Sequence, residues 1–282
     1  MAAEEPLGYP RRTLVRPTSI RGLGVRSGLD VQLTIAPAES GAGIVFERID
    51  IGRQWPADLE HALPLPACSS IGDGDARVDF VEHLMAVLWA ECISDAVIRL
   101  DGPEVPLIDG SATALLAAVR DAGTVEQDGI VRVLRPREPL FHIGDDRALV
   151  VLPAASAAFS YSLVHSHRLI GHQSAEFSPA RDDFGDVLAP ARTFATFEEI
   201  EALMQAGMIA AGSEENCLIV HGDGYSAEPF APNAMARHKI VDLLGDLYLL
   251  GRPLQAHVIG YRTGHADNRA IAGMVLEACA GQ

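Results

Sequence analysis

Hydrophobic residues recur along the chain in two patterns, as short apolar runs and as longer stretches with helical spacing. Residues 30–36 and 43–48 are rich in β-branched side chains and bounded by Gly, Pro and Ser, which predicts two strands. Apolar residues over 79–91 fall near helical spacing, which predicts a helix with one buried face. A strand over 95–100, a Pro-rich loop and a helix from Ser111 to the stop signal at Gly123 complete this half.

The second half repeats the ending of the first. The pattern predicts a helix over 234–250, a strand over 255–261, a glycine turn and a helix from Ala266. This recurrence indicates an α+β fold of two related domains, residues 1–127 and 128–282. We place the division where acidic and glycine residues interrupt the pattern, at 125–130.

The segment 193–216 has no counterpart in the first half and is predicted to be an insert. It carries a short apolar stripe and two glycines that can act as hinges, Gly207 and Gly212. The stripe has two interpretations, a core helix of the insert or a wall for an apolar ligand favoured by adaptable methionines. Its members are Ile200, Leu203, Met204, Met208 and Ile209.

Composition and charge restrict the class of protein. An apolar content of 48% is that of a globular protein, and a formal net charge of -16 argues against general binding to nucleic acid or anionic lipid. The acidic start, Met1 to Pro6, lacks the order of a secretory signal, and no apolar run approaches the ~18 residues of a membrane span. We therefore expect a cytoplasmic protein with at most peripheral membrane contact. A monomer and a small-molecule partner are expected as well.

Candidate chemistry begins on the helix over 234–250. His238 and Asp242 stand four residues apart, so both side chains rise from one helix face as two aligned metal ligands. Asp246 extends the row by one turn and can orient a histidine by accepting its hydrogen bond. A surface ion pair is the commoner explanation of such spacing, but the apolar neighbours favour a buried helix, where unpaired charges are costly.

The helix over 79–91 supplies the groups that a hydrolytic metal site still lacks. His83 is a third ligand candidate, and the adjacent Glu82 can accept a proton from water. If the two helices pack face to face, His83 and His238 meet at the interface between the halves, a usual place for an active site. His265, in a glycine turn before the last helix, is the candidate general acid. Each feature alone also fits an ordinary helix start or loop histidine.

Five motifs occur in a fixed order along nearly the whole chain. They are Val81-Glu82-His83-Leu84, the run Pro103 to Ala112, Ala191-Arg192-Thr193-Phe194, the run Arg237 to Leu247, and Gly264-His265-Ala266. Together these motifs resemble one known family, UDP-3-O-acyl-N-acetylglucosamine deacetylase. The resemblance implies two α+β domains with the helices packed between two sheets, and hydrolysis of an N-acetyl amide in lipid A biosynthesis.

The resemblance also implies a role for individual residues. His83, His238 and Asp242 correspond to ligands of Zn²⁺, with Fe²⁺ as an alternative ion. Glu82 corresponds to the general base, and His265 to the general acid with Asp246 as its partner. Thr193 would stabilise the oxyanion, and the insert would hold the acyl chain. The expected substrate-binding residues, for an acylated UDP-glucosamine, are Lys239, Phe194, Gly264, Ile200 and Met208.

The chain departs from the family pattern at two places. Arg26 stands where the family usually has a histidine, and Asn233 and Ala234 replace an Asp-Glu pair. These departures motivate a second hypothesis, a related zinc amidohydrolase acting on another N-acyl sugar. A third hypothesis is a non-catalytic relative that binds a nucleotide sugar, although such a protein has no need of Glu82 and His265.

Overall fold

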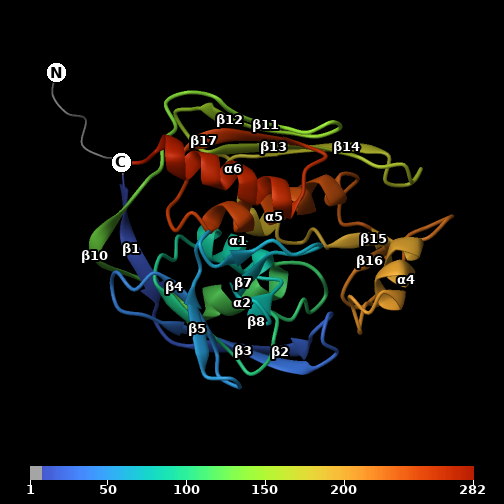
Figure 1. The fold of residues 1–282 in the computed structure, drawn as a ribbon, viewed down its shortest axis with the longest axis horizontal. Helices are drawn as coiled ribbons and strands as arrows, with labels where there is room; N and C mark the ends of the chain where they lie inside the picture. The colour runs from blue at the N-terminus through green and yellow to red at the C-terminus, as the bar shows by residue number, and fades with distance from the viewer. Residues whose placement is uncertain (1–7) are drawn as a thin grey trace.

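The structure, a computed structural model, describes residues 8–282, in which two five-stranded sheets enclose a layer of helices (Figure 1). The acidic stretch Met1 to Pro6 lies outside the described residues. The first sheet has the order β2-β3-β9-β4-β5, in which only β9 and β4 are parallel. Its strands are β2 (Thr18–Leu23), β3 (Asp30–Pro37), β4 (Ile44–Arg48), β5 (Arg53–Pro56) and β9 (Ala96–Leu100).

The second sheet repeats this topology strand for strand. Its order is β11-β12-β17-β13-β14, and again only the pair in the third and fourth places, β17 and β13, is parallel. The α+β class is thus confirmed, with one topology used twice. The strands are β11 (Leu140–Ile143), β12 (Ala148–Pro153), β13 (Ala158–Val164), β14 (His172–Phe177) and β17 (Ala256–Tyr261).

Four helices fill the space between the sheets. In each half a helix precedes the last strand of the sheet and another follows it, the order predicted from the sequence. Their apolar faces belong to one buried cluster that also takes side chains from both sheets, so the two halves share a core. The helices are α1 (Glu82–Ala90), α2 (Thr113–Ala122), α5 (Ala234–Tyr248) and α6 (His265–Ala278).

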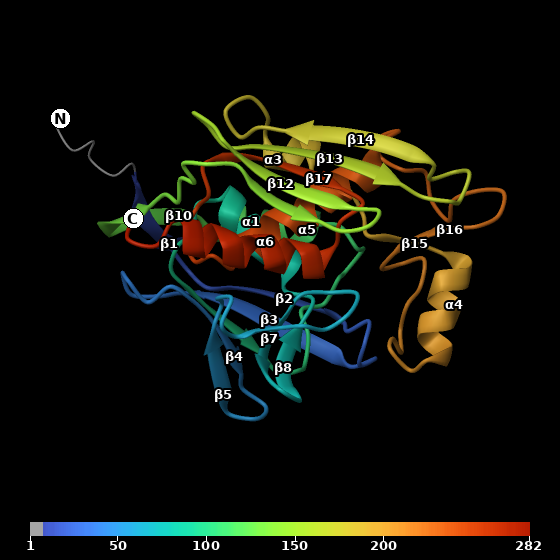
Figure 2. The same ribbon diagram turned by 45° about the horizontal axis from the view of Figure 1, so that its top comes forward.

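Both halves carry an insertion at the same topological place, between the fourth strand and the first helix. The first holds a small sheet of β6 (Ala62–Leu63), β7 (Ser70–Asp73) and β8 (Ala76–Asp79). The second holds α3 (Phe184–Val187), β15 (Phe194–Thr196), α4 (Phe197–Gln205) and β16 (Leu218–Val220). A capping box between Thr196 and Glu199 starts α4, which stands away from the sheets (Figure 2).

The interruption expected over 125–130 is instead part of a strand. β10 (Thr124–Arg132) pairs antiparallel with β1 (Gly8–Leu14) in a two-stranded ribbon beside the two sheets. Its pattern does not alternate because the ribbon buries little, so the sequence gives no periodic signal there. Gln127 pairs with Arg11 and Ile130 with Pro10, and the two residues between them, Asp128 and Gly129, form a bulge within the strand.

Close contact between α1 and α5 depends on one glycine. A Cβ at Gly245 would overlap the carbonyl oxygen of Glu82, so only glycine lets the start of α1 lie against α5. This contact brings the Glu82-His83 pair next to the row of His238, Asp242 and Asp246. Among residues 8–282, no helix is long and apolar enough to cross a lipid bilayer.

Candidate metal and catalytic site

Two residues near the start of α1 have a left-handed backbone conformation. Phe80, two residues before the helix, has φ 60°, and Ala67, in the segment packed against it, has φ 70°. Non-glycine residues adopt this left-handed region at a cost of about 1 kcal/mol or more, and such residues concentrate at functional sites. Both side chains line the pocket described below, so the strain lies where the site is built.

Two imidazoles and one carboxylate converge from α1 and α5. The Nε2 atoms of His83 and His238 lie 3.7 Å and 3.3 Å from Oδ1 of Asp242. The ligand atoms of all three side chains fall within 4.8 Å of one another, and each residue is at most 4% exposed. Zinc binds nitrogen and oxygen at ~2.0–2.2 Å, which places two ligands of a tetrahedral ion roughly 3.3–3.6 Å apart. The spacing therefore fits a shared divalent cation.

Hydrogen bonds orient these ligands for a metal. Nδ1 of His238 donates to the carbonyl oxygen of Ala191 at 3.0 Å, which leaves Nε2 with its lone pair toward Asp242. Nζ of Lys239 donates to Oδ2 of Asp242 at 2.7 Å, so Oδ1 remains free. Nδ1 of His83 is buried and meets no hydrogen-bond partner among the described residues. The cation would bind the other ring nitrogen, Nε2, which faces Asp242, so this unpaired Nδ1 is not one of the ligand atoms.

The protonation states suit cation binding. Burial, with the nearby charges of His83 and Lys239, lowers the pKa of His238 to about 3, so this imidazole is neutral at pH 7. Burial pushes the pKa of Asp242 upward, but the charges of His238 and Lys239 outweigh it and hold the pKa well below its usual range. A neutral imidazole and an ionised carboxylate are the forms that bind metal.

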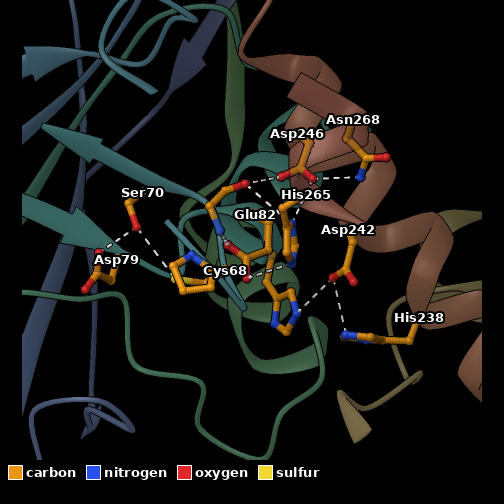
Figure 3. A network of polar contacts seen from close by, with 12 residues as sticks. Cys68, Ser70, Asp79, Glu82, His238, Asp242, Asp246, His265 and Asn268 are labelled. Atoms are coloured by element: carbon orange, nitrogen blue, oxygen red, sulfur yellow. Dashed lines mark hydrogen bonds and ion pairs between the residues drawn. The ribbon is translucent and has the colours of Figure 1, made fainter. Parts of the chain in front are cut away.

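A second group of polar side chains joins Glu82 to His265 beside the three ligands (Figure 3). Nδ1 of His265 donates to Oδ2 of Asp246 at 2.8 Å, and its Nε2 lies 4.0 Å from Oε1 of Glu82. Burial lowers the pKa of His265, but the Asp246 carboxylate outweighs burial and raises it to about 10. Burial raises the pKa of Glu82, although the charges of His265 and His83 oppose this. The site thus pairs a protonated imidazole with a buried carboxyl.

Sequence reasoning missed the residues that fix this pair. Oγ of Ser69 donates to Oδ1 of Asp246 at 2.5 Å, and Nδ2 of Asn268 donates to Oδ2 at 2.8 Å. The backbone N–H of Ser69 donates to Oε2 of Glu82 at 3.0 Å. Ser69 belongs to a loop far from α5 and α6 in the sequence, so no spacing could have indicated these contacts. Asn268 lies one turn after His265 on α6, where i, i+3 spacing was the available signal.

The site opens into a cavity of about 180 Å³ between the two insertions. Thr193, Phe194, Lys239 and Ile200 line it, together with Glu82, His265 and the three ligands. Met208 and Gly264 are not among its lining residues. Leu203 and Ile209 of the insert line it instead of Met208. Its far wall is a small apolar cluster that includes Val25, Phe80, Leu107, Ile200, Ile209 and Cys217.

The departures from the family pattern lie outside the lining of this cavity. Nε of Arg26 lies 3.3 Å from Oδ2 of Asp79, and its guanidinium stands 5.6 Å from the ring centre of Phe80. Asn233 donates to the carbonyl oxygen of Ser174 and accepts from Arg237, a structural role before α5. Neither Asn233 nor the buried Ala234 lines the cavity. Arg26, Asn233 and Ala234 thus replace neither a candidate metal ligand nor a member of the Glu82–His265 pair.

Three buried ligand groups beside a carboxyl and a protonated imidazole define the class of the site, a candidate metal-dependent hydrolase. The family model described as UDP-3-O-acyl N-acetylglycosamine deacetylase matches residues 11–277. The chain belongs to this family.

Curated relatives cover almost the whole chain. Proteins named UDP-3-O-acyl-N-acetylglucosamine deacetylase are 35% identical in Chlamydia abortus, 36% in Myxococcus xanthus and 35% in Synechocystis. The matches cover 95%, 96% and 94% of this chain and 97%, 88% and 98% of the relatives. The likeness therefore extends over both sheets and both insertions.

Proposed function

We propose that this protein hydrolyses the N-acetyl amide of UDP-3-O-acyl-N-acetylglucosamine, giving acetate and the free 2-amino sugar for lipid A biosynthesis. The observation that carries the proposal is the Glu82–His265 pair, 4.0 Å apart and adjacent to the three ligand groups. Amide hydrolysis needs a base for the attacking water and an acid for the departing nitrogen, and this pair offers both in one cavity.

Zn²⁺ is our proposal for the ion, held by His83, His238 and Asp242, with Fe²⁺ as the alternative. Three protein ligands of N and O type are the usual set for catalytic zinc. When bound, the ion would lower the pKa of a water and polarise the acetyl carbonyl. Elemental analysis of purified protein distinguishes the two ions.

Glu82 acts as the proposed general base. Its Oε2 is fixed by the backbone N–H of Ser69, and its burial favours the neutral form, so it can take and hold a proton. As the water oxygen bonds to the acetyl carbon, Glu82 removes one water proton. Ser69 thus aims the carboxylate without taking part in proton transfer.

His265 acts as the proposed general acid. Because Nδ1–H is held by Asp246, the proton that faces Glu82 and the cavity is the one on Nε2. This proton passes to the sugar nitrogen as the C–N bond breaks, which converts a poor leaving group into an amine. Before that step, the imidazolium and the Thr193 hydroxyl would stabilise negative charge on the carbonyl oxygen.

The remaining lining residues are proposed to bind the substrate. Nζ of Lys239 lies 5.8 Å from the ring centre of Phe194. The ammonium group and the aromatic ring would therefore contact neighbouring parts of the sugar. Ile200 lies on the apolar wall and is proposed to contact the acyl chain. Gly264 and Met208 are also proposed to bind the substrate, although neither lines the cavity. Gly264 is the N-cap residue directly before His265, and Met208 is the neighbour of Ile209 in the chain.

Acetate release from UDP-3-O-acyl-N-acetylglucosamine tests the proposed activity. Zinc-loaded protein should release acetate, and Glu82→Gln should lower kcat by about 10²-fold or more with unchanged zinc content. His238→Ala should lose both zinc and turnover. Glu91→Gln, a matched substitution at the other end of α1 where Glu91 pairs with Arg120, should behave as the wild type. A folded, zinc-loaded wild type that releases no acetate would contradict the proposal.

A further inference from the structure

A second cavity lies at the opposite end of α1 and α5 from the catalytic site. Glu82 and His83 begin α1 in the catalytic cavity, whereas Trp89 and Ala90 end α1 in the second one, where Tyr248 ends α5. Its volume is about 410 Å³, against about 180 Å³ for the catalytic cavity. Ligand cavities in proteins occupy roughly 300–1,000 Å³, so the second cavity is large enough for a small molecule.

The walls of this cavity are apolar and uncharged. Alanine, proline, valine and aromatic side chains make up most of the lining, and none of the lining residues within 8–282 carries a charge. The ribbon of β1 and β10 contributes one wall through Tyr9 and Val131, and the turn between β12 and β13 contributes another through Ala157. A charged ligand would lose its hydration here without gaining a partner, so the lining selects a neutral apolar molecule.

One buried polar group gives the cavity a directional contact. Gln255 lines it and is 7% exposed. Its Nε2 donates to the carbonyl oxygens of Ala154 and Ala155 at 3.1 Å and 2.9 Å, which uses both amide hydrogens and fixes the amide orientation. Among the described residues, nothing donates a hydrogen bond to Oε1 of Gln255. The ligand that satisfies this group carries a hydrogen-bond donor.

We propose that this cavity is a second binding site, separate from catalysis, for an uncharged aliphatic molecule with a hydrogen-bond donor such as a hydroxyl at one end. The aliphatic part would pack between Trp89 and Ala157, and the donor would reach Oε1 of Gln255. Such binding would not require the reaction at the other end of the helices.

A tryptophan provides the measurement. The chain contains two tryptophans, Trp55 in the first sheet and Trp89 in this cavity, so Trp89 is the only one in Trp55→Phe. Titration of this variant with 10-bromo-1-decanol, whose bromine quenches indole fluorescence on contact, should give saturable quenching. From 8-bromo-1-octanol to 10-bromo-1-decanol, affinity should rise about three- to fourfold for each added methylene.

Matched probes and variants separate this site from unspecific binding. The methyl ether of 10-bromo-1-decanol lacks the donor and should bind about tenfold more weakly, and 10-bromodecanoate at pH 8 should bind more weakly still.

Ala157→Leu fills the cavity and should abolish saturable quenching, with Ala180→Leu as a second filling variant. Ala227→Leu, exposed and lining neither cavity, should leave it unchanged. Quenching that is linear in probe, unaffected by both filling variants, or equally strong with the carboxylate would overturn the proposal.

Discussion

At the scale of single residues, the site works by keeping a proton on His265 and off His238. Both imidazoles are buried, and burial alone lowers the pKa of each. Asp246 reverses this for His265, because it is hydrogen-bonded to the ring and is itself fixed by Ser69 and Asn268. Two histidines on neighbouring helices thereby suit the opposite roles proposed for them, a neutral ligand and a charged acid.

Replacing Asp246 by Asn tests that assignment through the pH profile. The pKa of His265 is raised to about 10, so the imidazolium persists through neutral pH and is lost as the pH rises through that value. Asp246→Asn removes the largest of the charges that raise the pKa of His265, so burial lowers the pKa against only the weaker effects of Glu82 and Asp242. The alkaline limb of kcat against pH should move to lower pH by about one unit or more.

Asp267→Asn is the matched control for this shift. Asp267 lies two residues from His265 and accepts from the backbone N–H of Gly264, but it is not among the largest influences on the pKa of His265. Its substitution should leave the alkaline limb in place. An unmoved limb in Asp246→Asn would mean that His265 is not the group whose proton limits turnover.

The catalytic candidates could be predicted from the sequence because each lies in a local motif. Glu82 and His83 are adjacent, and His238, Asp242 and Asp246 share one helix face at spacings of four. What spacing could not give is the environment of each group. Ser69 contacts Glu82 and Asp246 only through the fold, and its own sequence surroundings carry no motif. The left-handed backbone at Ala67 and Phe80 was equally hidden, since neither residue type favours that conformation.

At the scale of elements, the site depends on how closely α1 approaches α5. Helix periodicity predicted both helices to within about three residues of their observed ends, because each buries a continuous apolar face. The pairing of β10 with β1 was not predictable in this way, since the ribbon is mostly exposed and its partners are far apart in sequence. The division into domains at residues 127 and 128 stays a proposal, and it falls inside β10.

Gly245→Ala should separate α1 from α5. The added Cβ would overlap the backbone carbonyl of Glu82, which cannot turn aside as a side chain can. Overpacking of this kind costs about 1–3 kcal/mol, and here it also displaces Glu82 and His83 from Asp242. We expect lower stability in denaturant unfolding, weaker zinc binding and loss of most turnover.

Gly273→Ala, on the neighbouring helix α6, should raise the stability that Gly245→Ala lowers. Gly273 lies within α6, and a Cβ built there meets nothing within 4 Å. Alanine should therefore stabilise the protein by about 0.5–1 kcal/mol through helix propensity alone. If Gly245→Ala were as stable and as active as Gly273→Ala, the close packing of the two helices would not be what assembles the site.

At the scale of the whole molecule, the proposed metal connects two halves that repeat one topology. His83 belongs to the helix layer of the first half, and His238 and Asp242 to that of the second. The three side chains are buried together where the two halves meet, so a bound ion would offset the cost of burying a carboxylate beside two imidazoles. The ion and the shared apolar core would then both hold the first half against the second.

Removing the metal should consequently lower the stability of the entire fold rather than of one half. An ion that binds only the folded state at 100 times its Kd adds about 2.7 kcal/mol, and a chelator removes that contribution. Thermal unfolding should show one cooperative transition that moves to lower temperature with chelator and returns when zinc is restored. His238→Ala should unfold at a temperature that neither treatment changes, because its ligand set is incomplete. If chelator removed the zinc but left the wild-type transition in place, the ion would not be holding α1 against α5, and the apolar core alone would join the two halves.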